Sequence, residues 1–134
     1  MTARTPQTVN VRVRYAETDK MGVVYHANYL VWFEVGRCEL LRAVGQNYRD
    51  LEAAGIGLPV IEAHCEYKSP ARYDDELVVK TTGKMLSPAR IEFEYEISRP
   101  SDATVNAIGR TVHAAVDTNG RPCRLPDHIR ELLE

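Results

Sequence analysis

The stretch Asn28-Tyr-Leu-Val-Trp-Phe-Glu-Val-Gly-Arg-Cys-Glu-Leu-Leu-Arg-Ala-Val44 carries apolar side chains that fall on nearly every side of a helical wheel. A helix that is apolar on most faces is usually buried. Asn28 is a candidate N-cap and Gly45 a candidate terminator, which gives a helix of about 17 residues and roughly 25 Å. The sequence therefore predicts one long, buried helix.

Segments typical of strands lie on both sides of this helix. Before it, apolar residues from Val9 to Tyr15 alternate with polar ones, which predicts a first strand that ends at Tyr15. After it, the pattern predicts a short helix at 47–54, four strands at 60–67, 77–85, 91–99 and 105–117, and a closing helix at 127–133. One long helix provides too few crossovers for a parallel sheet. We therefore expect an α+β fold in which five antiparallel strands hold the helix on their concave face.

The composition limits the classes of function. A chain of 134 residues has the usual size of one domain, so residues 1–134 are expected to form a single unit. A net charge of -2 with both signs interspersed argues against a nucleic-acid partner. No apolar run approaches the roughly 20 residues of a membrane span, and the amino terminus lacks a secretory segment. Three widely spaced cysteines favour reduced thiols, so we expect a cytoplasmic location.

Several motifs of well-known chemistry are missing from the sequence. It contains no G-x-S-x-G elbow, no G-x-x-x-x-G-K-[ST] phosphate loop and no C-x-x-C pair. The four histidines lack the spacing of a zinc site. We expect neither a metal nor a cofactor.

A dense polar and aromatic segment, residues 15–29, runs from the first predicted strand into the long helix. A helix start offers unpaired backbone N–H groups and a partial positive charge, so such junctions suit active sites. Glu17 and Asp19 lie here, and Gly22 allows a sharp turn that swings Asp19 toward the helix. Alternatively, both carboxylates cap the helix, and the spacing alone does not choose between these readings.

The run Tyr15-Ala-Glu-Thr-Asp-Lys-Met-Gly-Val-Val-Tyr-His-Ala-Asn-Tyr-Leu-Val-Trp-Phe-Glu resembles the active-site signature of the 4-hydroxybenzoyl-CoA thioesterase-like hotdog family. It is most similar to the small acyl-CoA thioesterases associated with Tol-Pal gene clusters. Later blocks are similar as well, at residues 36–42, 58–60, 67–76 and 120–126. The resemblance implies a hotdog fold and hydrolysis of acyl thioesters of CoA or acyl carrier protein.

The resemblance also implies roles for individual residues. The catalytic carboxylate falls on Asp19, which attacks the thioester carbonyl or activates a water that does so. The backbone N–H of His26 is the expected donor to the oxyanion, and the His26 imidazole either orients water or assists the leaving thiolate, or only forms supporting hydrogen bonds. Tyr15 falls on a position that lines the site, with a core aromatic as the alternative. Glu17 is expected to be structural.

Substrate contacts follow from the same resemblance. The residues expected to bind substrate are Gly22, Val24, Tyr25, Tyr29, Arg90 and Arg124. Arg90 and Arg124 belong to a wider set of candidates for the CoA phosphates, with Lys68, Arg72 and Arg121. A lone five-stranded sheet leaves its edges open, so we expect a homo-oligomer, a dimer or a tetramer.

Two other functions stay open at this point. A hotdog enoyl-thioester hydratase would use an Asp and a His for proton transfer, and Asp19 with His26 fits superficially. A non-catalytic acyl-CoA-binding hotdog protein would bind the ligand without turnover, and such a sensor is expected to carry an additional output segment.

Overall fold

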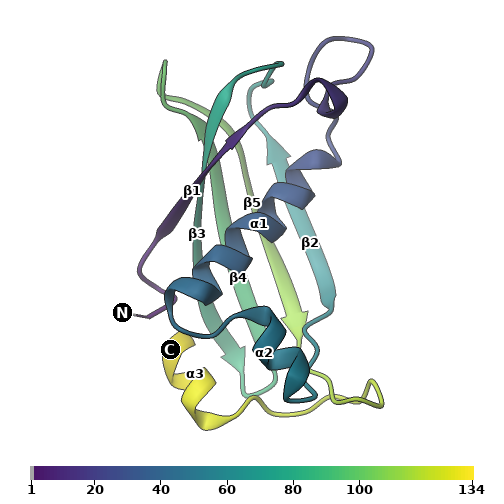
Figure 1. Ribbon diagram of the computed structural model, residues 1–134, viewed down its shortest axis with the longest axis vertical. Helices are drawn as coiled ribbons and strands as arrows, with labels where there is room; N and C mark the ends of the chain where they lie inside the picture. Colours follow the sequence, from purple (N-terminus) through teal and green to yellow (C-terminus); the bar gives the residue numbers. More distant parts are fainter. Residues whose placement is uncertain (1) are drawn as a thin grey trace.

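The computed structural model describes residues 2–134. The prediction of one domain over residues 1–134 includes Met1, which lies outside this part. Five strands form one sheet, and three α-helices and a short 3-10 helix accompany it (Figure 1). In chain order the elements are β1 (Gln7–Arg12), η1 (Tyr15–Glu17), α1 (Asn28–Ala43), α2 (Tyr48–Ala53), β2 (Val60–Tyr67), β3 (Glu76–Ser87), β4 (Arg90–Arg99), β5 (Thr104–Ala114) and α3 (Asp127–Leu133).

The sheet has the strand order β1-β3-β4-β5-β2, and each neighbouring pair is antiparallel. This confirms the expected α+β architecture. Helix α1 runs across one face of the sheet (Figure 1). In β4 the apolar residues Ile91, Phe93, Tyr95 and Ile97 are buried, whereas the glutamates between them are exposed or half-buried on the opposite face. Period-2 alternation therefore identified the face that packs against the helix.

The contact between α1 and the sheet depends on small residues. Phe33 of α1 is fully buried and stacks on Tyr95, with ring centroids 4.2 Å apart. A Cβ atom added to Gly109 of β5 would lie 2.5 Å from the Phe33 ring and 2.6 Å from the carbonyl oxygen of His64 in β2. Glycine at this position therefore lets the helix and two strands approach closely.

The helix ends differ in part from the prediction. Gly45 has φ +88° and its N–H donates to the Arg42 carbonyl, so it terminates the helix as expected. Asn28 is not the N-cap, because its side-chain amide donates to the Glu17 carbonyl at 2.9 Å and Ala27 takes the cap position instead. The prediction that the helix is buried on most faces is wrong at Leu30 and Val31, which are 42% and 51% exposed in the single chain.

The first strand is shorter than predicted. It ends at Arg12, and Tyr15 begins η1 instead of closing the strand. The reason is local: the buried Glu17 carboxylate accepts the Arg14 N–H at 2.8 Å, which turns the chain away from the sheet. Within residues 2–134, no helix is both long and apolar enough to cross a bilayer.

A buried histidine links the sheet to the chain before β2. His113 of β5 is 1% exposed, and its Nδ1 lies 2.9 Å from the Leu58 carbonyl oxygen, which only accepts. Nδ1 therefore carries the proton, and Nε2 accepts from the Thr111 hydroxyl at 2.8 Å. Thr111 in turn accepts from the Tyr95 hydroxyl at 2.6 Å. This chain of donors and acceptors fits neutral His113.

We expect His113 to make the protein less stable in acid. Burial, with the nearby positive charge of Arg37 as a smaller cause, lowers the pKa of His113 below its usual 6.5. Below pH 6.5 the unfolded chain takes up a proton that the folded protein excludes. As far as His113 is concerned, the free energy of unfolding is highest above pH 6.5. It falls with decreasing pH, by up to about 1.4 kcal/mol per pH unit, until the pKa of His113 in the folded protein is reached.

Urea unfolding at pH 7.5 and pH 5.5 measures this effect. His113→Asn removes the titrating group and is expected to flatten the dependence, whereas His128→Asn, at an exposed position of α3, keeps it. Equal pH dependence in wild type and His113→Asn would show that His113 is not the cause.

Candidate active site

The segment between η1 and α1 forms a tight hairpin that presents Asp19. The Asp19 N–H donates to the Val23 carbonyl at 2.8 Å, and the Gly22 N–H to the Asp19 carbonyl at 2.9 Å. Gly22 has φ +79°, a conformation that glycine adopts readily, as the sharp turn predicted here requires. Asp19 Oδ1 accepts the Met21 N–H at 2.9 Å and, more weakly, the Val23 N–H at 3.4 Å. The carboxylate is therefore fixed at the base of its own turn.

Neither carboxylate caps α1. The helix has no acidic residue in its first turn, and Ala27 at the cap position supplies no side-chain hydrogen bond. Glu17 is structural, as expected, because its backbone carbonyl accepts both the Tyr25 N–H and the Asn28 side chain at 2.9 Å. The alternative reading, in which Glu17 and Asp19 cap the helix, is therefore wrong.

The start of α1 leaves backbone donors without acceptors. The N–H groups of Asn28, Tyr29 and Leu30 donate to the carbonyls of residues 25, 26 and 27. In the part of the chain that the structure describes, the N–H groups of His26 and Ala27 donate to no protein acceptor. An unpaired N–H at a helix start, with the helix dipole behind it, attracts negative charge.

Asp19 and His26 line one cleft of about 320 Å³. The other lining residues are Val23, Val24, Tyr29, Tyr67, Lys68, Ser69 and Pro70. One wall thus comes from the hairpin and α1, and the facing wall comes from the end of β2 and the loop after it. The cleft joins a carboxylate, an uncapped helix start and an apolar surface.

Tyr67 connects the two walls. Its hydroxyl donates to the His26 carbonyl at 3.0 Å, and its ring packs edge-on against Tyr29 at 5.1 Å. Partial desolvation, followed by the interaction with the neighbouring Cys65 side chain, raises the pKa of Tyr67 to about 12. The hydroxyl therefore stays protonated and keeps donating at neutral pH, which ties β2 to the start of α1.

The structure brings together some of the predicted site residues and separates others. Asp19, His26, Val24 and Tyr29 line the cleft, and Gly22 forms the adjoining turn. Tyr25 is half exposed and packs against the His26 ring, with centroids 4.5 Å apart.

Tyr15 does not lie in the cleft. It is 79% exposed and packs edge-on against Tyr73, so the alternative that Tyr15 is a core aromatic is wrong. Its placement follows from the early end of β1, because η1 turns the Tyr15 side chain outward.

Two predicted cations lie far from the cleft within one chain. Arg90 begins β4 and pairs with Ala114, whereas the cleft lies where Tyr67 pairs with Ala107, at the other end of β5. Arg124 lies beyond β5, just before α3. Among the candidate cations, Lys68 lines the cleft, and its ammonium lies 3.0 Å from the Glu66 carboxylate.

Sequence reasoning did not single out Tyr67, Ser69 and Pro70. They are 40 or more residues from Asp19, and only the pairing of β2 with β5 brings them to the helix start. The one available signal was the family-like block at residues 67–76, which identified the segment but gave no role to these residues.

A wider hollow of about 390 Å³ lies on the sheet beside His64, Glu94 and Arg110. Its floor is formed by strands whose backbone groups pair within the sheet. Arg110 lies 3.8 Å from Glu62, and Glu94 3.7 Å from Lys84. This hollow offers neither an uncapped helix start nor a fixed carboxylate. The smaller cleft beside Asp19 is therefore the better candidate for catalysis. Within residues 2–134 no cluster of His, Cys, Asp or Glu suits a metal ion.

The long helix on a five-stranded antiparallel sheet is the architecture of the hotdog fold, which solved thioesterase structures share. Residues 13–133 match the thioesterase-like superfamily, and the chain belongs to that family.

Individual relatives agree with this assignment. The acyl-CoA thioester hydrolase YbgC of Escherichia coli is 32% identical over 119 residues, which cover 89% of each chain. A Bacillus subtilis protein named as a candidate acyl-CoA thioesterase, YneP, is 44% identical over 91 residues, which cover 68% of this chain and 66% of that protein. The crystal structure of a DHNA-CoA thioesterase from Staphylococcus aureus has a TM-score of 0.85 at 36% identity and covers 90% of this chain and 80% of that one.

Proposed function

We propose that this protein is an acyl-CoA thioesterase that uses Asp19 as its catalytic carboxylate. One observation carries the proposal: the fixed Asp19 side chain and His26, with its unpaired backbone N–H, line the same cleft. Thioester hydrolysis needs these two elements, a group that attacks or activates water and a donor for the oxyanion. The names of relatives such as YbgC support the substrate class.

The reaction follows one of two balanced routes. Asp19 attacks the carbonyl carbon, the C–S bond breaks, CoA leaves as a thiolate that takes up a proton, and water then hydrolyses the acyl anhydride. Alternatively, Asp19 accepts a proton from a water that attacks the carbonyl directly, after which the C–S bond breaks and the leaving CoA thiolate takes up that proton. In both routes the His26 N–H donates to the developing oxyanion, and loss of such a donor typically raises the barrier by about 3 kcal/mol.

The walls of the cleft suit an acyl-CoA substrate. Val24 and Tyr29 provide apolar surface for the acyl group, and Lys68 lies at the same cleft as a cation for a phosphate. Tyr25 is half exposed and lies beside the His26 ring, where it could contact the substrate from outside the cleft. Whether the His26 imidazole assists the thiolate or only supports the local hydrogen bonds is a separate question, because the backbone donor does not require it.

We propose a homo-oligomer as the active form. Strand β2 has one unpaired edge, and seven of its eight residues are exposed, including Val60 and Ile61. Antiparallel pairing of β2 with a second copy would cover this edge. It would also place the Arg90 end of the second copy beside the cleft, which is how Arg90 and Arg124 would reach the CoA phosphates. Light scattering coupled to gel filtration measures the mass, and a monomer at micromolar concentration would contradict the proposal.

The finer assignments belong to the same proposal. The resemblance of residues 15–34 supports an enzyme like the small acyl-CoA thioesterases associated with Tol-Pal gene clusters, and the three widely spaced cysteines support a cytoplasmic location. Acyl carrier protein is the alternative carrier of the acyl group. Comparing kcat/KM for one acyl group on CoA and on acyl carrier protein distinguishes the two carriers.

A substrate panel tests the proposed function. Purified protein is incubated with short aliphatic, long aliphatic and aromatic acyl-CoA, and a thiol-reactive dye measures released CoA. We expect turnover with at least one of them. Hydration of crotonyl-CoA without thiol release would indicate the hydratase, and tight acyl-CoA binding without any turnover would indicate the non-catalytic alternative.

A further inference from the structure

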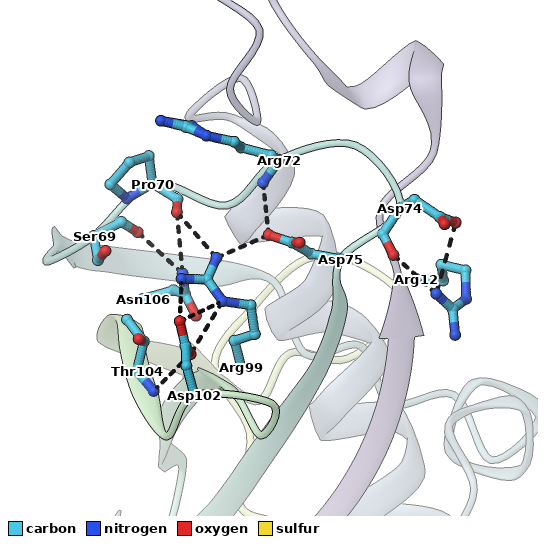
Figure 2. Close-up of polar contacts among 10 residues, drawn as sticks. All are labelled: Arg12, Ser69, Pro70, Arg72, Asp74, Asp75, Arg99, Asp102, Thr104 and Asn106. Atoms are coloured by element: carbon cyan, nitrogen blue, oxygen red, sulfur yellow. Dashed lines mark hydrogen bonds and ion pairs between the residues drawn. The ribbon is translucent and has the colours of Figure 1, made fainter.

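The loop after β2, residues 68–75, is held by a network of polar contacts centred on Arg99 (Figure 2). Arg99 ends β4, and its side chain is 19% exposed. Nη1 donates to Asp75 Oδ2 at 2.8 Å and, at 3.5 Å, reaches the Pro70 carbonyl. Nε and Nη2 donate to the two oxygens of Asp102 at 2.9 to 3.2 Å. One guanidinium thus ties the loop after β2 to the β4–β5 turn.

The partners of Arg99 fold the loop into a compact turn. Asp75 Oδ2 also accepts the Arg72 N–H at 2.9 Å, and the Asp75 N–H donates to the Arg72 carbonyl at 3.1 Å. Asn106, fully buried below the loop, donates from Nδ2 to the carbonyls of Ser69 and Pro70 at 3.2 and 3.4 Å (Figure 2). The loop therefore has few ways to move as long as Arg99 is in place.

This loop is also hydrogen-bonded to the hairpin that contains Asp19. The Val24 N–H donates to the Ala71 carbonyl at 2.8 Å, and Val23 forms an antiparallel bridge with Arg72. Val23 is hydrogen-bonded to Asp19 twice: its carbonyl accepts the Asp19 N–H, and its N–H donates to Asp19 Oδ1. Ala71 and Val24 are both buried, so this junction has little freedom to adjust. A continuous chain of contacts therefore leads from Arg99 to the carboxylate, through Asp75, Arg72 and Val23.

We propose that Arg99 is a positioning residue for Asp19, which it fixes through the loop at residues 70–75 and the Val23–Val24 strand of the hairpin. The inference rests on the proposed function of Asp19. Arg99 does not line the cleft. It holds the loop that carries the hairpin, and the same loop supplies Ser69 and Pro70 to the opposite wall. Arg99 therefore sets the distance between the carboxylate and the helix start.

Arg99→Met tests this role. The methionine keeps the aliphatic stem of the side chain but removes the guanidinium that donates to all four acceptor oxygens. A displacement of about 1 Å at a reacting group costs up to about a hundredfold in rate, so we expect kcat to fall by about ten- to a hundredfold. KM should change by less than about threefold, since the substrate walls contributed by α1 remain. Arg110→Met, which removes a surface ion pair with Glu62, is the matched control and should leave kcat unchanged.

Two further measurements separate positioning from simple destabilisation. Guanidinium at tens of millimolar should restore part of kcat in Arg99→Ala, while sodium chloride at the same concentration should not. Amide hydrogen exchange at Val24 should accelerate by at least about tenfold in Arg99→Met and stay as in wild type in Arg110→Met. If Arg99→Met does not fold, Arg99→Gln, which loses the charge and the paired donors to Asp102, serves for the same measurements.

The outcomes distinguish this inference from the proposed function. Unchanged kcat for folded Arg99→Met, or unchanged exchange at Val24, would overturn the positioning role even if the protein hydrolyses acyl-CoA. Full activity of Asp19→Asn would instead overturn the proposed function. In that case the exchange at Val24 still decides whether Arg99 fixes the hairpin.

Discussion

Asp19→Asn is expected to lower the rate of thiol release from acyl-CoA by at least about a hundredfold without unfolding the protein. The amide is a poor nucleophile and a poor base, so both proposed routes lose their first step. The fold should tolerate the change, because the side-chain oxygen of Asn still accepts the Met21 N–H that Asp19 accepts now. Steady-state kinetics with the thiol-reactive dye measures the rate, and circular dichroism checks the fold.

Two control variants make this result specific. Asp127→Asn removes a carboxylate of α3 that is 82% exposed and outside the cleft, and should keep full activity. His26→Ala removes the imidazole but keeps the backbone N–H, so the rate should fall less than in Asp19→Asn. If Asp19→Asn and Asp127→Asn had equal activity, Asp19 would have no catalytic role.

The largest expected effect on stability comes from the contact between α1 and the sheet. Gly109→Ala should lower the free energy of unfolding by about 3 kcal/mol, because its Cβ would overlap both the Phe33 ring and the His64 carbonyl. Phe33→Ala should lower it by about 3 to 5 kcal/mol, because it leaves a cavity over Tyr95. Urea unfolding monitored by circular dichroism measures both values.

The double variant tests whether the two effects share a cause. With the Phe33 ring removed, the new methyl group at position 109 has space on the helix side, although the His64 carbonyl remains in its way. The combined loss should therefore be smaller than the sum of the two single losses by about 1 kcal/mol or more. Simple additivity would show that Gly109→Ala acts through the β2 backbone and not through the helix.

The elements themselves could be predicted because their signals are local. The alternation from Ile91 to Ile97 is a strand period, and the apolar density from Tyr29 to Leu41 is that of a packed helix. The bounds of β2 and α3 agree with the predicted ranges. The errors occur where side chains compete for backbone groups, since Glu17 ended the first strand early and drew Asn28 away from the cap position.

The candidate site was predictable on one side only. The hairpin and the helix start lie within 12 residues of one another, so Asp19 and His26 could be found as one segment. The opposite wall depends on the pairing of Tyr67 with Ala107 and on a loop held by Arg99 and Asn106. Such contacts join residues 24 or more positions apart, which is beyond the range of any helix or strand period in the sequence.

The sequence by itself determined the element types, the buried face of β4 and the carboxylate beside the helix start, because periodicity and residue chemistry act over a few residues. Tertiary structure alone decided that Tyr15 lies outside the cleft, that Tyr67 and Pro70 form its second wall, and that Arg90 and Arg124 lie at the far end of the sheet. The physical reason is that strand order and loop packing result from the simultaneous burial of many distant residues.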